Sequence, residues 1–155
     1  MTDFSDMLRH DAVLTNVVAA NKKAVLQCLA TTAAGIVGTD AKTIADRLGA
    51  REKLGSTGFG GGVAIPHAKL PDLTAPTGLF VRLSQAIDFQ AVDNLPVDLV
   101  FVLLSPVDAG SDHLKALARV SRRLRDRSFL GKLRGAGSRD ALYALFTADE
   151  SRHAA

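Results

Sequence analysis

Hydrophobic and polar residues follow different periods along the chain, and these periods predict strands and helices. Residues 12–19 are rich in β-branched side chains and residues 78–83 alternate, so both segments are expected to form strands. Residues 63–65 predict a short strand. Residues 97–104 form a nearly continuous apolar run, which is typical of a central strand that is buried on both faces.

Apolar residues at helical spacing predict helices between these strands. Asn21 is a good cap for a first helix, which Gly38 is expected to end. Thr39 or Asp40 can cap a second helix, which runs to about Lys53. Further along, residues 130–133 predict a short helical turn, and Ser138 can cap a last helix over residues 139–146.

A third helix is expected to begin near Ser111 and to have one apolar and one basic side. The sequence leaves open whether the basic side is a docking surface or is simply solvated. The predicted inward side comprises Leu114, Leu117, Ala118, Ser121 and Leu124, and the predicted outward side comprises Lys115, Arg119, Arg122 and Arg125.

About four or five strands interleaved with four or five helices predict an α/β domain with one mostly buried sheet covered by helices. The length of 155 residues fits one domain spanning residues 1–155, with an ordered core of about 12–146. Residues 1–8 and 148–155 are expected to fray.

Composition narrows the classes of function. A hydrophobic content of 47% and a charged content of 23% indicate a folded chain. The net charge is only +3, and the sequence has no Trp and one Tyr, so nucleic-acid binding is not expected. A single cysteine, Cys28, fits a reducing compartment. No signal-like or membrane-spanning apolar run occurs, so we expect a cytoplasmic protein without membrane insertion.

The most distinctive stretch runs from Thr57 to Leu70 and holds four glycines within five residues, followed by Pro66 and His67. Glycines permit positive φ angles and close approach of other groups. Pro66 keeps the residue before it extended and presents His67 where the short strand ends. Residues 69–76, which contain two prolines, are expected to form a loop.

An exposed imidazole next to such a loop suits phosphoryl chemistry, because imidazole is nucleophilic near neutral pH. The sequence offers three sources of charge stabilisation for a phosphoryl group. They are the backbone N–H groups of the glycine loop, His113 in the first turn of a helix, and the guanidinium of Arg51. The expected phosphate-binding residues are Gly60, Gly61, Gly62, Ser56 and Thr57.

Several separated motifs resemble one known family. The segments 51–58 and 60–67, then 87–89, 93–99 and 113–118, occur in the order found in the fructose/mannitol-type IIA components of the bacterial phosphoenolpyruvate-dependent phosphotransferase system. The resemblance covers residues 12 to 146. Leu70 and Pro71 after His67, together with the free-standing length, resemble the nitrogen-regulatory branch of that family.

The resemblance implies a mixed sheet with helices on both faces and a phosphocarrier function. His67 falls on the phosphorylated histidine, His113 on the second active-site histidine and Arg51 on the arginine of the family motif. The implied donor is a small histidine-phosphorylated carrier of the HPr/NPr type, and the implied readout is phosphorylation-dependent binding of target proteins. No metal or other cofactor is implied. Gly61 is a departure, because the family commonly has a polar side chain there.

Other interpretations remain open on the sequence. Arg51 and Glu52 could form an ordinary surface pair, and His113 could simply face solvent. Asp88, Asp93 and Asp98 could suggest a metal site, although turn formation and capping explain them better. For the whole chain, the alternatives to a regulatory phosphocarrier are a sugar-transport IIA component that passes phosphate to a IIB domain, and an interaction module that is never phosphorylated.

Overall fold

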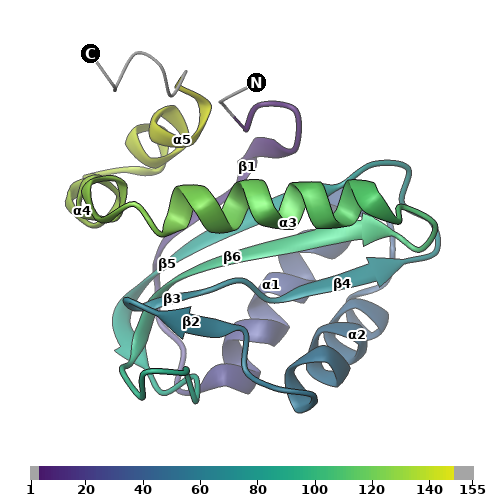
Figure 1. Ribbon diagram of the computed structural model, residues 1–155, viewed down its shortest axis with the longest axis horizontal. Coiled ribbons are helices and arrows are strands. Elements are labelled where there is room, and N and C mark those ends of the chain that lie inside the picture. Colours follow the sequence, from purple (N-terminus) through teal and green to yellow (C-terminus); the bar gives the residue numbers. More distant parts are fainter. Residues whose placement is uncertain (1–3, 149–155) are drawn as a thin grey trace.

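The computed structural model describes residues 4–148, which form one mixed β-sheet with helices on both faces (Figure 1). The strands are β1 (Leu8–Val17), β2 (Gly58–Gly60), β3 (Val63–Ala64), β4 (His67–Leu70), β5 (Thr77–Ile87) and β6 (Val97–Pro106). Their order in the sheet is β1-β5-β6-β3-β2, and β4 also pairs with β6. β5 and β6 are antiparallel, whereas β1 runs parallel to β5, and β3 and β4 run parallel to β6. The mixed sheet implied by the family resemblance is confirmed.

The helices divide between the two faces of the sheet. The helices are α1 (Lys22–Val37), α2 (Ala41–Lys53), α3 (Ser111–Leu124), α4 (Arg127–Gly135) and α5 (Arg139–Thr147). α1 and α2 pack against each other on one face, and α3 crosses the other face in front of β6 (Figure 1). α4 and α5 continue from α3 toward β1. Within residues 4–148, no helix is both long and apolar enough to cross a bilayer.

The predicted central strand forms the middle of the core. Every residue of β6 from Leu99 to Ser105 is completely buried, because the strand has neighbours on both sides and helices on both faces. Burying one large apolar side chain stabilises a fold by about 1.5–3 kcal/mol, so this strand contributes much of the hydrophobic stabilisation.

Three predicted helix caps are confirmed. The Asn21 side chain accepts a hydrogen bond of 2.9 Å from the backbone N–H of Ala24, and Asp40 accepts one of 2.7 Å from Thr43. Ser138 likewise accepts from Ala141 at 3.1 Å. Each cap satisfies a backbone donor that the first helical turn would otherwise leave unpaired.

The predicted inward side of α3 is right for Leu124, which is buried, and for Leu117, which is partly buried against the core, but it is wrong for Leu114 and omits His113. Leu114 is 66% exposed, whereas His113 and Arg123 are only 7% exposed. The side chains of α3 that are buried are His113, Ala116, Val120, Arg123 and Leu124. The spacing of apolar residues in the sequence is compatible with more than one rotation of the helix about its own axis. Arg123 can be buried because its guanidinium lies 3.9 Å from the centroid of the Phe129 ring.

Two further expectations about local structure are also wrong. Residues 67–70 form β4 and belong to the sheet, so the expected loop begins only after Leu70. At the N-terminus, Phe4 is 2% exposed, packs against Phe101 and Phe146, and donates its N–H to the carbonyl of Phe146. Phe4, Met7 and Leu8 are therefore part of the core, and residues 1–3 and 149–155 lie outside the described part of the chain.

We predict that Phe4→Ala lowers the free energy of unfolding by about 3–5 kcal/mol, because it leaves a cavity among packed aromatic rings. Urea denaturation followed by circular dichroism measures this change. Val18→Ala is the control, since Val18 is 80% exposed, and it is expected to change stability by less than about 0.5 kcal/mol. Equal stability of the Phe4 variant and the wild type would show that the N-terminal segment does not contribute to the core.

Candidate functional site

Three side chains from three separate elements meet at one edge of the sheet. Arg51 comes from the last turn of α2, His67 from the first residue of β4 and His113 from the first turn of α3. The Nε atom of Arg51 lies 3.2 Å from Nε2 of His67, and the two imidazole centroids are 5.7 Å apart. The structure therefore brings together the three residues that the sequence singled out as catalytic.

Pro66 separates two short strands and positions His67. β3 pairs with β6 through Val63 and Ala64, and β4 resumes the same parallel pairing with His67 opposite Leu103. The carbonyl of Pro66 accepts a hydrogen bond of 3.0 Å from the N–H of Leu103, so the interruption itself is tied to the central strand. His67 is thus held at the start of a strand, and not at the end of one as its sequence had suggested.

The hydrogen bonds of His67 determine its tautomer. Nδ1 lies 2.8 Å from the carbonyl oxygen of Ile65, which can only accept, so Nδ1 carries the proton. Nε2 then bears the lone pair and accepts from Arg51. Burial lowers the pKa of His67, and the nearby charge of Arg51 lowers it further, against the opposing effects of the Ile65 bond and Glu52. The imidazole is therefore neutral and available as a nucleophile at neutral pH.

His113 is buried against β6 and does not face solvent. Its Nδ1 lies 2.7 Å from the hydroxyl oxygen of Ser105, a residue that is fully buried. Burial lowers the pKa of His113, and the charges of His67 and Lys69 act in the same direction. Ser105 was not among the residues selected from the sequence. Its hydroxyl, directly after the apolar run 97–104 in a buried strand, was the signal that could have revealed it.

Arg51 and Glu52 do not form a surface pair with each other. Arg51 donates from Nη1 to the carbonyl of Gly55 at 2.8 Å, which directs its Nε toward His67. Glu52 turns inward, accepts from Lys22 at 2.9 Å, and accepts from both the backbone N–H and the hydroxyl of Thr57. Glu52 therefore fixes the segment that follows α2, while Arg51 remains free to face the imidazole.

A shallow hollow of about 320 Å³ lies over the three side chains and is rich in cations. Arg47 donates to the carbonyl of Lys69 at 3.0 Å, which holds these two residues at its rim. No carboxylate is among its lining residues, which are Arg47, Ala50, Arg51, Leu54, His67, Ala68, Lys69 and His113. Such a site favours an anion next to the Nε2 atom of His67.

The glycine loop does not belong to this hollow. Gly60, Gly61 and Gly62 have φ angles of 113°, 69° and 81° and form the turn between β2 and β3. The N–H of Gly61, which was expected to face a phosphate, donates to Asp93 at 3.0 Å. At Gly62, the φ of 81° is one that residues with a side chain rarely adopt, so the turn favours glycine there.

Ser56 and Thr57 likewise have partners within the fold. The Ser56 hydroxyl donates to the carbonyl of Phe89 at 2.8 Å, and Thr57 is bound to Glu52. Neither residue lines the hollow beside His67. Ser56, Thr57 and Gly61 each bind a partner within the fold, and none of the five residues that were expected to bind phosphate lines the hollow beside His67.

The carboxylates that could have suggested a metal site form turns and an ion pair. Asp88 accepts from the N–H of Gln90, Asp93 accepts from that of Leu95, and Asp98 pairs with Arg134 at 2.9 Å. Across residues 4–148, no group of three or more His, Cys, Asp or Glu side chains is placed to hold a metal ion.

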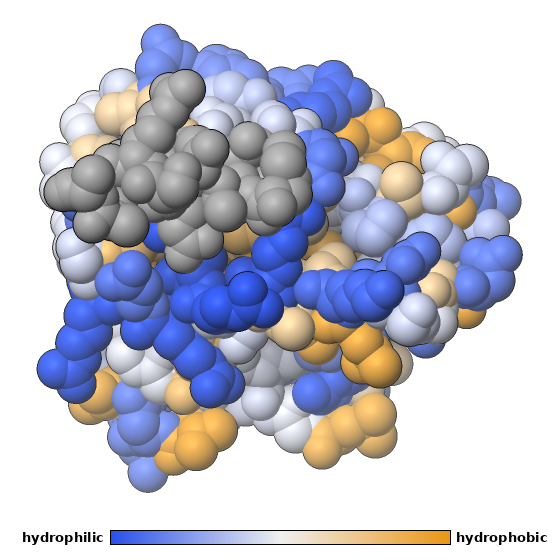
Figure 2. Space-filling view, turned by 45° about the horizontal axis from the view of Figure 1, so that its top comes forward, coloured by the Kyte–Doolittle hydropathy of each residue, from blue (hydrophilic) through white to orange (hydrophobic). Residues whose placement is uncertain are grey.

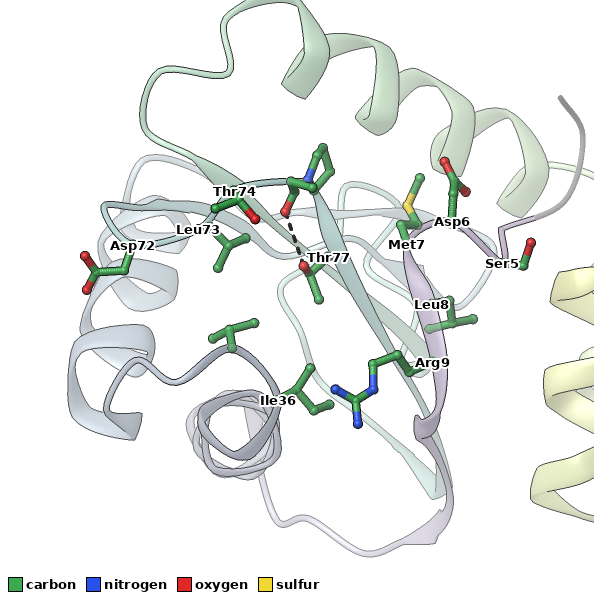
Figure 3. A pocket seen from close by; sticks show the side chains of 13 residues that line it. Ser5, Asp6, Met7, Leu8, Arg9, Ile36, Asp72, Leu73, Thr74 and Thr77 are labelled. Carbon is green, nitrogen blue, oxygen red and sulfur yellow. Dashed lines mark hydrogen bonds between the residues drawn. The ribbon is translucent and has the colours of Figure 1, made fainter.

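A second hollow, of about 330 Å³, lies between the N-terminal segment, the end of α1 and the loop before β5 (Figure 3). Arg9 extends into it and pairs with Asp11, and Asp6 at its edge pairs with Arg119. None of the residues selected from the sequence lines this hollow, so it has no part in the proposed chemistry.

Comparison with known proteins identifies a family and relatives that match nearly the whole chain. The family model described as "Phosphoenolpyruvate-dependent sugar phosphotransferase system, EIIA 2" matches residues 6–149. A nitrogen regulatory protein of Bradyrhizobium diazoefficiens is 48% identical over 141 residues, which cover 91% of this chain and 92% of that protein. A fructose-specific EIIA component of Haloferax volcanii is 34% identical over 143 residues, covering 92% and 93% of the two chains.

Among solved structures, the nitrogen regulatory protein IIA-Ntr of Neisseria meningitidis superposes with a TM-score of 0.87 at 30% identity, covering 92% of this chain and 97% of that one. The same arrangement of helices and sheet is therefore found in a relative of similar length. With a family model that matches nearly all of its residues, this chain belongs to the EIIA type 2 family of the phosphoenolpyruvate-dependent sugar phosphotransferase system.

Proposed function

We propose that this protein is a regulatory phosphocarrier that accepts a phosphoryl group on Nε2 of His67. The donor is a small histidine-phosphorylated carrier protein of the HPr/NPr type, and the protein signals by binding target proteins differently in its two states. The proposal rests on the orientation of the His67 ring. Its Nδ1 is hydrogen-bonded to the carbonyl of Ile65, so the lone pair of Nε2 faces a cationic hollow. The proposal places this activity in the cytoplasm, where Cys28 would stay reduced.

The transfer step needs no proton to leave His67. The Nε2 lone pair attacks phosphorus, and an N–P bond forms on His67 as the N–P bond of the donor's phosphohistidine breaks. The electrons of the broken bond return to the donor imidazole, which leaves in its neutral form. The Nδ1 proton of His67 stays in its bond to Ile65, whose carbonyl stabilises the positive charge that develops on the ring.

The cations around Nε2 are placed to stabilise the transferred group. Arg51 now donates to Nε2 and would donate instead to phosphoryl oxygens as the N–P bond forms. If the buried hydroxyl of Ser105 donates to Nδ1 of His113, the proton of His113 sits on Nε2 and can point at the same oxygens. Lys69 adds positive charge at the rim. Metal ions have no role in this scheme.

The proposed regulation depends on the negative charge that phosphorylation of His67 adds next to exposed apolar side chains. Phosphorylation adds about two negative charges at pH 7. Leu54 is 85% exposed and lines the hollow, and Leu114, next to His113, is 66% exposed. A partner that packs on these apolar groups would have to desolvate the phosphate, so binding in the two states should differ strongly. The nitrogen regulatory protein from Bradyrhizobium, at 48% identity, supports this branch of the family.

The fructose-specific relative keeps a second candidate function open, namely a sugar-transport component that passes phosphate to a IIB domain. The two functions share the chemistry at His67 and differ in the acceptor. Efficient transfer from the phosphorylated protein to a purified IIB domain would favour sugar transport and would contradict the regulatory proposal.

Incubation with enzyme I, a small carrier protein and phosphoenolpyruvate is predicted to increase the intact mass by one phosphoryl group. His67→Ala removes the nucleophile and should abolish the increase, whereas His10→Ala is the matched control and should leave it unchanged. His10 is exposed and contacts Asp140 and Tyr143, outside the hollow. Failure of the wild type to gain the group would favour an interaction module, and equal gain by the His67 variant would place the phosphate elsewhere.

The acceptor activity is predicted to fall at low pH, because protonation of Nε2 removes the attacking lone pair. Burial lowers the pKa of His67, so transfer should stay fast down to a pH below the ordinary imidazole value of about 6.5. Arg51→Gln removes a neighbouring positive charge and should therefore raise the pKa of His67 and slow transfer.

Nuclear magnetic resonance titration of the His67 ring gives the pKa directly, and transfer rates at each pH test the link to acceptance. Thermal melting of Arg51→Gln controls for unfolding. A pKa of His67 above the ordinary value, or an unchanged pKa in the Arg51 variant, would contradict the electrostatic account of the site.

A further inference from the structure

Positive charge is concentrated in the C-terminal part of the chain. Residues 111–148 contain nine Lys or Arg and three Asp, a net formal charge of +6, whereas the remaining residues sum to −3, which gives +3 for the whole chain. The segment forms α3, α4 and α5, so the charge gathers on one side of the molecule.

Some of these cations serve the fold. Arg119 pairs with Asp6, Arg134 pairs with Asp98, and Arg123 is buried on the Phe129 ring. Arg122 and Arg125 differ from these three, because both are exposed and no carboxylate of residues 4–148 forms an ion pair with either. They are three residues apart, so they lie side by side on the surface of the helix end.

Arg125 connects this charge to an aromatic platform. Its guanidinium lies 5.3 Å from the centroid of the Phe59 ring, which is only partly buried. A cation on the face of an aromatic ring keeps its N–H donors available for a carboxylate. We call the surface formed by Phe59, Arg122 and Arg125 the Arg–Phe face.

Exposed apolar residues extend this surface. Val92 is 77% exposed and Leu95 is 56% exposed. Their loop is tied to β2, because the N–H of Val92 donates to the carbonyl of Gly58 at 2.9 Å and Asp93 accepts from Gly61. Figure 2 shows hydrophilic and hydrophobic side chains next to one another on the side of the molecule that carries α3.

The Arg–Phe face is separate from the His67 site. Arg125 follows His113 by twelve positions, which corresponds to roughly 18 Å along the axis of α3. The two surfaces therefore lie at opposite ends of one helix, and none of the three residues of the Arg–Phe face lines the hollow over His67.

The local charges favour a protein partner over a continuous anionic surface. Asp126 lies directly after Arg125 and Asp93 directly after Val92, and both are exposed. A lipid headgroup layer or a nucleic-acid backbone would bring phosphates close to these carboxylates, at an electrostatic cost. A peptide can place its carboxylates only opposite the two arginines and an apolar side chain against Phe59. Arginine and aromatic residues are also enriched where protein interfaces gain most of their affinity.

We propose that the Arg–Phe face is a second docking surface, which binds an acidic protein segment carrying an apolar residue. Binding there is independent of phosphate on His67. The inference goes beyond the proposed function and does not depend on it.

Fluorescence anisotropy tests the proposal with a short labelled peptide of Asp and Glu that carries one central Phe. Arg122→Glu/Arg125→Glu should weaken binding at least about tenfold, because two attractive contacts become repulsive. Lys23→Glu/Lys42→Glu is the control, since it changes the net charge equally on α1 and α2, which cover the opposite face of the sheet. This control should bind nearly as tightly as the wild type, and His67→Ala should bind equally well.

Phe59→Ser separates docking from general attraction, because it keeps every charge but removes the platform for the apolar residue. It should weaken binding most at high ionic strength, where charge attraction is screened. Equal loss in the lysine control, or no loss in the arginine variant, would overturn the proposal. Preference for vesicles of phosphatidylglycerol or for a single-stranded oligonucleotide over the peptide would also overturn it, as would a requirement for His67.

Discussion

The hydrogen bond from Nδ1 of His67 to the carbonyl of Ile65 is the constraint on which the site depends. It places the only ring proton on the inner nitrogen and leaves the lone pair on the outer one. Pro66, between the two partners, shapes this local turn, and its own carbonyl is fixed to β6. The chemistry of the site thus begins with a hydrogen bond from the His67 side chain to the backbone carbonyl two residues earlier, which is supported by the most deeply buried strand of the sheet.

The surroundings of this imidazole are arranged against positive charge on the ring and in favour of negative charge beside it. Burial lowers the pKa of both His67 and His113; the charge of Arg51 would also repel a protonated His67, and that of Lys69 a protonated His113. A bound or transferred anion would offset the positive charge that surrounds the two imidazoles. The rigid support comes from α2, β4, β6 and α3, whose ends meet at one point although they are far apart in the sequence.

Much of the fold could be predicted because it rests on local signals. The apolar run of β6 and the caps Asn21, Asp40 and Ser138 each follow from a few neighbouring residues. The phase of α3 could not, because His113 and Arg123 are buried through partners on other elements, namely Ser105 and Phe129. Phe4 was missed for the same reason, since its burial depends on rings from the other end of the chain.

The sequence predicted the three side chains that meet at the site, but it did not reveal the partners of the residues in the glycine loop. Arg51, His67 and His113 were selected from their chemistry, and the resemblance of whole motifs to a family, which carries information about distant contacts, supported the same three residues. The glycine loop was assigned to phosphate because its backbone N–H groups could line an anion site. The N–H of Gly61 is bound to Asp93, thirty-two residues further along the chain, and no local signal in the sequence indicates that partner.

The ring nitrogen of His67 that carries the phosphoryl group can be identified by spectroscopy. Nitrogen-15 and phosphorus-31 spectra of the phosphorylated protein, with labelled histidine, distinguish the two ring nitrogens through their coupling to phosphorus. The account predicts phosphorus bonded to Nε2 of His67 with the proton retained on Nδ1. Phosphorus on Nδ1, or a proton on Nε2 in the unphosphorylated protein at neutral pH, would contradict it.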